Sequence, residues 1–129
     1  MSQTERDLHR KIAVECFNKT WDYLEKERRD ADDDRQMLHL AHTSRYHWGL
    51  VGTARNLAVG DWQVSRAYAA LKQSELALHF AKSALEICER NNLSDLLVSA
   101  YEGMARALAL SSNISQARDY LSMARKQMG

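Results

Sequence analysis

Three histidines between residues 39 and 47 come closest, by type and spacing, to forming a metal site. His39 and His42 are three residues apart, so on a helix both side chains could reach one ion. His47 lies about 80° further round the helix and two turns along, too far to join them. No H-E-x-x-H signature and no nearby cysteine pair completes a zinc site. His39 and His42 are therefore weak candidate ligands, and we expect interface or partly exposed histidines with no bound metal.

The acidic run from Asp30 to Asp34 contains the D-x-D-x-D opening of a calcium-binding loop. Such a loop also needs glycine at its sixth position and glutamate at its twelfth. Here those positions hold Arg35 and Ala41, so we expect no calcium site. The run instead favours the start of a helix, because carboxylates oppose the positive end of the helix dipole.

Motifs for covalent or phosphate chemistry are missing from the sequence. It contains no G-x-S-x-G nucleophile motif, no glycine-rich phosphate loop and no C-x-x-C pair. Cys16 and Cys88 lie far apart within helical patterns, which predicts buried free thiols in a reducing cytoplasm. We therefore expect no enzymatic activity and no cofactor. An enzyme or metal protein centred on the histidines of residues 39–47 is the least favoured alternative.

Composition favours an all-helical chain with no electrostatic preference for nucleic acid. The 129 residues are 45% hydrophobic, with no proline and five glycines, so little interrupts a helix. A formal net charge of +1 gives no long-range attraction to nucleic acid or to an anionic membrane. The N-terminus is too polar for a signal peptide, and no apolar run approaches membrane-spanning length. The sequence predicts a soluble cytoplasmic protein that binds neither nucleic acid nor membrane.

Apolar periodicity and turn residues predict six helices. Ser2 and Glu5 form a capping box before a first helix over about residues 4–28. A second helix follows the acidic run and ends near Leu50. The third covers about residues 53–71, the fourth ends at Asn91, Ser94 or Asp95 caps the fifth, and the sixth follows a turn at 111–113. Paired in order, the helices form three hairpins at about 4–51, 53–92 and 93–129, within one domain spanning residues 1–129.

The hairpins repeat along the chain. Residues 58–92 carry an ungapped pattern of large and small residues, and Trp21, Asp61 and Tyr101 mark its equivalent positions at one constant interval. This pattern resembles the tetratricopeptide repeat (TPR), although the interval here is longer than the family period of about 34 residues. The resemblance implies an all-α, right-handed α-α superhelix of six helices in three TPR-like hairpins. The residues that carry it are Val64, Ser65 and Tyr68 on one helix, then Ala77, Ala81 and Ala84 on the next, where small side chains let helices cross closely.

The resemblance also implies a concave groove lined by the first helix of each hairpin, in which a protein or peptide partner lies. Lys26, Arg66 and Arg106 then share one groove position, since they are separated by the same constant interval. A column of basic side chains suits an acidic partner segment, because guanidinium groups bind carboxylates through two hydrogen bonds. The alternative is that these cations are solvated or paired with Glu102 and Asp22. The residues expected to flank the column are Tyr23, Trp62 and Gln63.

A second class of function is self-association as a homodimer, or docking within a larger assembly. The last helix carries more apolar side chains than one neighbouring helix can cover, and the first helix shows a similar group. These residues are Ile114, Tyr120, Leu121, Met123 and Met128 in the last helix, with Phe17, Trp21 and Tyr23 in the first.

Overall fold

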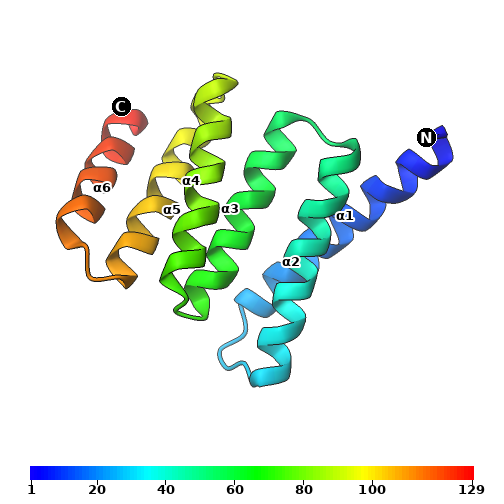
Figure 1. Ribbon diagram of the computed structural model, residues 1–129, viewed down its shortest axis with the longest axis horizontal. Coiled ribbons are helices and arrows are strands. Elements are labelled where there is room, and N and C mark those ends of the chain that lie inside the picture. The colour runs from blue at the N-terminus through cyan, green and yellow to red at the C-terminus, as the bar shows by residue number, and fades with distance from the viewer.

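The computed structural model describes residues 1–129 and contains six α-helices, one short 3-10 helix and no β-strand (Figure 1). The predicted all-α class is therefore confirmed. The elements are α1 (Gln3–Leu24), α2 (Ala31–Val51), α3 (Ala54–Ala70), α4 (Ser74–Arg90), η1 (Ser94–Leu96), α5 (Leu97–Leu110) and α6 (Ile114–Met128). No helix is both long and apolar enough to span a membrane.

Side-chain caps fix the starts of the first helices, because the first backbone N–H groups of a helix have no partner within it. The Ser2 hydroxyl accepts a hydrogen bond from the Glu5 N–H before α1, as predicted. Before α2, Asp30 and Asp33 form a reciprocal capping box. The acidic run thus begins a helix, as the sequence indicated.

The turns after α3, α4 and α5 share one backbone conformation. Lys72, Asn92 and Ser112, which are equally spaced along the chain, have positive φ angles of 60°, 54° and 65°. In each turn the next residue donates its N–H to a carbonyl five residues back, which satisfies a carbonyl left free at the helix end. The turns that end α3, α4 and α5 therefore recur at equal intervals along the chain.

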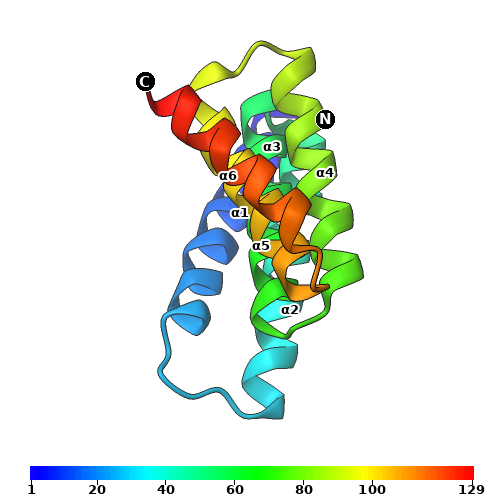
Figure 2. The ribbon, with the colours of Figure 1, turned by 90° about the vertical axis from the view of Figure 1, so that its left-hand side faces the viewer.

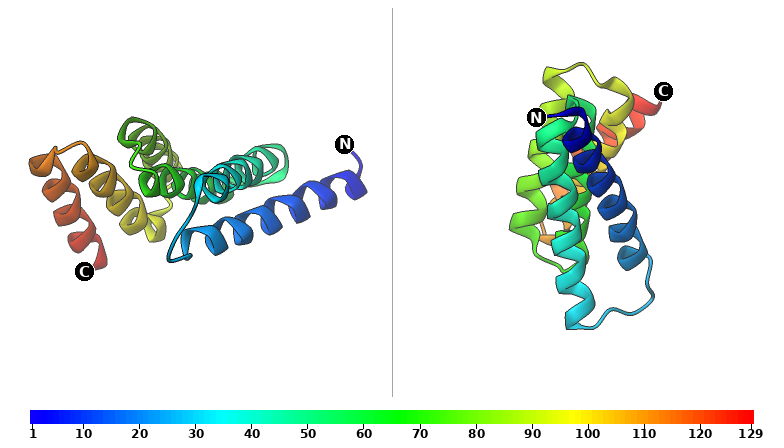
Figure 3. Two further views of the ribbon diagram at one scale, coloured as in Figure 1. Left: turned by 90° about the horizontal axis from the view of Figure 1, so that it is seen from below. Right: turned by 90° about the vertical axis from the view of Figure 1, so that its right-hand side faces the viewer.

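The helices pair in chain order, α1 with α2, α3 with α4 and α5 with α6. The pairs stack side by side, so α2 meets α3, α4 meets α5, and α3 also contacts both α1 and α5. Figure 3 shows this succession from the α1–α2 end to the α5–α6 end. The first helices of the three hairpins are thereby brought next to one another.

Alanines occupy the places where helices approach most closely. Ala77 is fully buried and packs with Ala69 and Ala107, which come from α3 and α5. The Ser65 hydroxyl donates to the Ala77 carbonyl at 2.7 Å, so α3 and α4 are close at this point. The prediction that small side chains mark helix contacts holds at Ala77, Ala81 and Ala117, which are 4% exposed or less.

Two predicted helix boundaries are wrong, the end of α1 and the start of α5. α1 stops at Leu24 rather than near residue 28, because the chain must leave the helix to reach the Asp30 cap of α2. The fifth helix is capped by neither Ser94 nor Asp95; a 3-10 turn, Ser94–Leu96, leads into it instead.

α6 closes one end of the stack and no helix covers its outer side (Figure 2). Ile114, Leu121, Met123 and Met128 are each at least 40% exposed on it. Tyr120, the fifth residue of the predicted group, is instead half-buried beside Tyr101 of α5. Self-association through α6 stays a prediction. The aromatic residues of α1 differ, because Phe17, Trp21 and Tyr23 are half-buried.

An ion pair joins the first hairpin to the second. The Asp61 side chain on α3 is only 4% exposed, and Arg45 on α2 donates to it at 2.7 Å. Ser83 on α4 donates to the other carboxylate oxygen at 2.5 Å. Gly60 leaves room for Arg45, since a Cβ there would lie 2.8 Å from the arginine Cδ. Three helices thus meet at one buried carboxylate.

This network predicts a strong asymmetry between single and double variants. Arg45→Met should cost about 3–5 kcal/mol of unfolding free energy, because it leaves a buried carboxylate without its cation. The double variant Arg45→Met, Asp61→Leu should recover much of that loss, since no charge stays buried. Urea unfolding at neutral pH measures both.

The matched control is Arg55→Met, which removes a pair with Asp95 whose side chains are 48% and 63% exposed. It should lower stability far less. A double variant no more stable than Arg45→Met alone would contradict the predicted recovery.

Candidate functional site

The groove residues predicted on the first helices of the hairpins include one unusual arginine. Arg66 on α3 lies beside a pair of indoles, with its guanidinium carbon 5.6 Å from the Trp21 ring centre and 5.9 Å from the Trp62 ring centre. The two rings are themselves 5.5 Å apart. Trp21 comes from α1, so the cluster joins two hairpins. Each contact has the geometry of a cation–π interaction.

No carboxylate pairs with Arg66, although its side chain is half-buried. Burial lowers the pKa of its guanidinium, the nearby Arg106 lowers this pKa further, and Glu102 acts in the opposite direction. Because a guanidinium keeps its proton in proteins, Arg66 remains a partly desolvated cation. Two arginines close together leave an excess of positive charge here.

Arg106 shares a surface hollow with Arg66. It projects from α5, is exposed, and forms a salt bridge with Glu102 one turn earlier on the same helix. Two leucines from α1 and α5 flank the cations. The lining residues, which we call the Arg66 hollow, are Leu24, Arg66, Ala69, Ala70, Arg106 and Leu110.

Lys26 does not join this hollow. The prediction that it projects from the first helix is wrong, because α1 ends at Leu24 and Lys26 lies in the connection to α2. Its amino group binds Asp33 at 3.0 Å and lies 5.6 Å from the Tyr23 ring centre. Lys26 and Tyr23 line a different surface hollow, with Gln36. Two of the three predicted cations are thus brought together.

The other flanking residues have divergent roles. Gln63 is 1% exposed, and its amide donates to the Phe17 carbonyl of α1 at 2.9 Å. This hydrogen bond links α3 to α1, so the Gln63 amide is not available to a partner. Trp62 is half-buried and lies beside Arg66, as predicted.

The histidines of α2 are spread over different contacts. His42 shares a hydrogen bond with the Tyr68 hydroxyl at 2.8 Å, and His39 is exposed. His47 lies 2.8 Å, nitrogen to nitrogen, from His9 on α1, a pair that the sequence analysis missed. No group of three or more His, Cys, Asp or Glu side chains is placed to hold a metal ion.

Comparison with protein-family models, curated proteins and solved structures finds no match for this chain. The resemblance of residues 58–92 to tetratricopeptide repeats therefore stays a prediction. Any role for the Arg66 hollow rests on its own geometry.

The half-buried histidines predict a loss of stability in mild acid. Burial lowers the pKa of His47, and its neighbour His9 lowers it further. Burial, then His39, lowers the pKa of His42. In both cases the unfolded chain binds protons more readily, so the stabilisation is full above the unfolded pKa and is lost as pH falls towards the folded one. Unfolding free energy should therefore decline from about pH 7 to about pH 5.5.

Urea unfolding across that range measures the slope. His47→Gln should flatten it, whereas His79→Gln, which replaces an exposed histidine of α4, should leave it as in the natural chain. Equal slopes in all three proteins would show that His47 does not contribute to the pH dependence.

Proposed function

We propose that this chain is a TPR-like protein-interaction module that binds a carboxylate-bearing segment of a protein partner at the Arg66 hollow. Arg66 is the principal contact and Arg106 the second. The observation that carries the proposal is a half-buried guanidinium without any carboxylate partner in the chain.

The position of Arg66 suits recognition of an anion. Cation–π contacts with Trp21 and Trp62 hold the guanidinium without using the N–H groups along its edge. Those groups match the two oxygens of a carboxylate. Because the site is partly shielded from water, such an interaction is stronger than on an open surface.

Arg106 favours the same ligand. Its charge lowers the pKa of Arg66, which reflects repulsion between the two cations. A partner carboxylate between them relieves that repulsion. Arg106 can bind it while it keeps its salt bridge to the half-buried Glu102. The repulsive pair therefore discriminates against basic segments.

The apolar rim of the Arg66 hollow adds a second requirement for the partner segment. Leu24 and Leu110 flank the two arginines, and Leu110 is 38% exposed. A partner with apolar side chains next to its carboxylates would cover this surface. An acidic segment interleaved with leucine is the simplest match.

A peptide pair tests the proposal. A labelled peptide of alternating glutamate and leucine should bind, and its affinity should fall as salt rises. The same peptide with glutamine in place of glutamate should bind far more weakly. Arg66→Ala should cost about 1.5–3 kcal/mol of binding free energy, and Arg66→Lys should only partly restore it.

Fluorescence anisotropy measures these affinities. Arg118→Ala, at an exposed arginine of α6 outside the hollow, is the matched control and should bind as the natural chain does. Equal affinity for the two peptides, or an unchanged affinity in Arg66→Ala, would contradict a carboxylate site at Arg66.

A further inference from the structure

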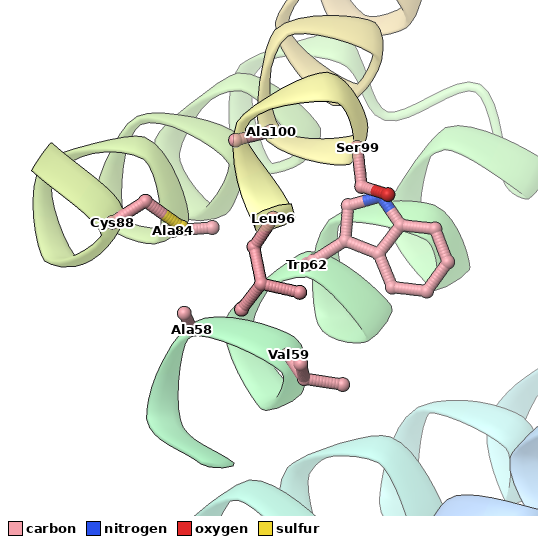
Figure 4. Close-up of a pocket in the computed structure, with 8 residues that line it drawn as sticks. All are labelled: Ala58, Val59, Trp62, Ala84, Cys88, Leu96, Ser99 and Ala100. Carbon is pink, nitrogen blue, oxygen red and sulfur yellow. The ribbon is translucent and has the colours of Figure 1, made fainter. Parts of the chain in front are cut away.

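A separate cavity lies between α3, α4 and the start of α5, beside Trp62. Its volume is about 160 Å³, and seven of its eight lining residues are hydrophobic. Figure 4 shows the side chains that surround it. None of them is an aspartate, glutamate, lysine, arginine or histidine. The cavity thus suits a neutral molecule.

Small side chains create this space. Ala58, Ala84 and Ala100 are each 3% exposed or less, and each comes from a different helix. The space is partly open to solvent, so a ligand can enter it without unfolding the surrounding helices. A protein cavity of about 150 Å³ can hold benzene, so this one has room for a single small ring.

Cys88 keeps the cavity wall uncharged. Burial raises the pKa of its thiol, and Asp95 raises this pKa further. The thiol therefore stays protonated at neutral pH and behaves as a small apolar group. The part of the cavity wall formed by Cys88 therefore gives apolar contact and carries no negative charge.

One edge of the cavity is polar. The indole Nε1–H of Trp62 is the one buried side-chain polar atom in the chain without a hydrogen-bond partner. Figure 4 shows it beside the hydroxyl of Ser99. Gly103 packs against the indole, where a Cβ would lie 3.4 Å from Trp62 Cδ1. A buried N–H without an acceptor costs free energy, which a ligand oxygen would recover.

We propose that this cavity binds a small, neutral, mainly apolar molecule with one carbonyl-type oxygen. The Ser99 side chain turns away from the indole to donate to this oxygen, which uncovers Trp62 Nε1–H as a second donor. The apolar body of the ligand lies against Ala58, Ala84 and Cys88. This site and the Arg66 hollow have no lining residue in common, and only the cavity lacks a charged side chain. Trp62 lies next to both, since its ring also contacts Arg66.

Two ring compounds of similar size test the proposal, cyclohexanone with a carbonyl oxygen and benzene without one. The chain has three tryptophans, so a ¹⁵N-labelled sample gives three indole N–H signals, and Trp62→Phe identifies the one from Trp62. Cyclohexanone should move the Trp62 signal downfield in a saturable way and leave those of Trp21 and Trp48 in place. Benzene should shift the methyl signals of Val59 and Leu96 without that downfield movement.

Variants separate the two parts of the site. Trp62→Phe keeps an aromatic ring but removes the donor, and should weaken cyclohexanone binding by about 3–10-fold while leaving benzene binding nearly unchanged. Ser99→Leu, at an exposed position on the rim, should abolish binding of both probes. Ser115→Leu, exposed on α6, is the matched control and should bind both normally.

Three outcomes would overturn the proposal. The first is that neither probe gives a saturable shift at Val59, Leu96 or Trp62. The second is that all three indole signals move together, which indicates solvent effects alone. The third is that both probes bind but cyclohexanone leaves the Trp62 N–H unmoved, which removes the hydrogen bond from the proposal.

Discussion

The carboxylate of Asp61 lies almost out of water at the junction of α2, α3 and α4, and a buried charge there requires partners. Arg45 and Ser83 supply them from the two flanking helices. Because Arg45 belongs to the first hairpin and Asp61 to the second, the pair restricts how these hairpins can rotate against each other. Gly60 is part of the same constraint, since a side chain there would block the approach of Arg45.

The candidate site depends on this junction. With the first two hairpins held together, Trp21 of α1 lies against Trp62 of α3, and Arg66 contacts both rings from one side. Gln63 supports the same contact from within, through its bond to the Phe17 carbonyl. Two arginines of these helices therefore differ in whether a carboxylate pairs with them. Arg45 is neutralised by Asp61, whereas Arg66 keeps a charge that no carboxylate in the chain pairs with.

Much of the fold could be predicted from local sequence signals. Caps, turn residues and apolar spacing depend on neighbours within a few residues, so the six helices and most of their ends were predictable. The constant interval between hairpins also identified Arg66 and Arg106 as neighbours in space. The end of α1 was missed, because it depends on where the chain must turn to reach Asp30, and Lys26 was misplaced with it.

Contacts between residues that are far apart in the chain left no comparable pattern in the sequence. Asp61 occupies a position where the repeat has a large residue, and nothing nearby in the sequence shows that Arg45 compensates for it. The His9–His47 contact joins two adjacent helices across a long stretch of chain. Gln63 was expected to flank the groove, and packing against α1 buries it instead. Side-chain partners across helices are set by tertiary packing, which spacing alone does not specify.

The central claim is that Arg66 is a preorganised carboxylate-binding cation, and its own Nε–H signal tests this most directly. In a ¹⁵N-labelled sample, loss of one arginine signal in Arg66→Lys identifies it. The account predicts a saturable downfield shift of that signal with the glutamate–leucine peptide and none with the glutamine version. An Arg66 signal unmoved by a peptide that shifts other arginines would contradict it.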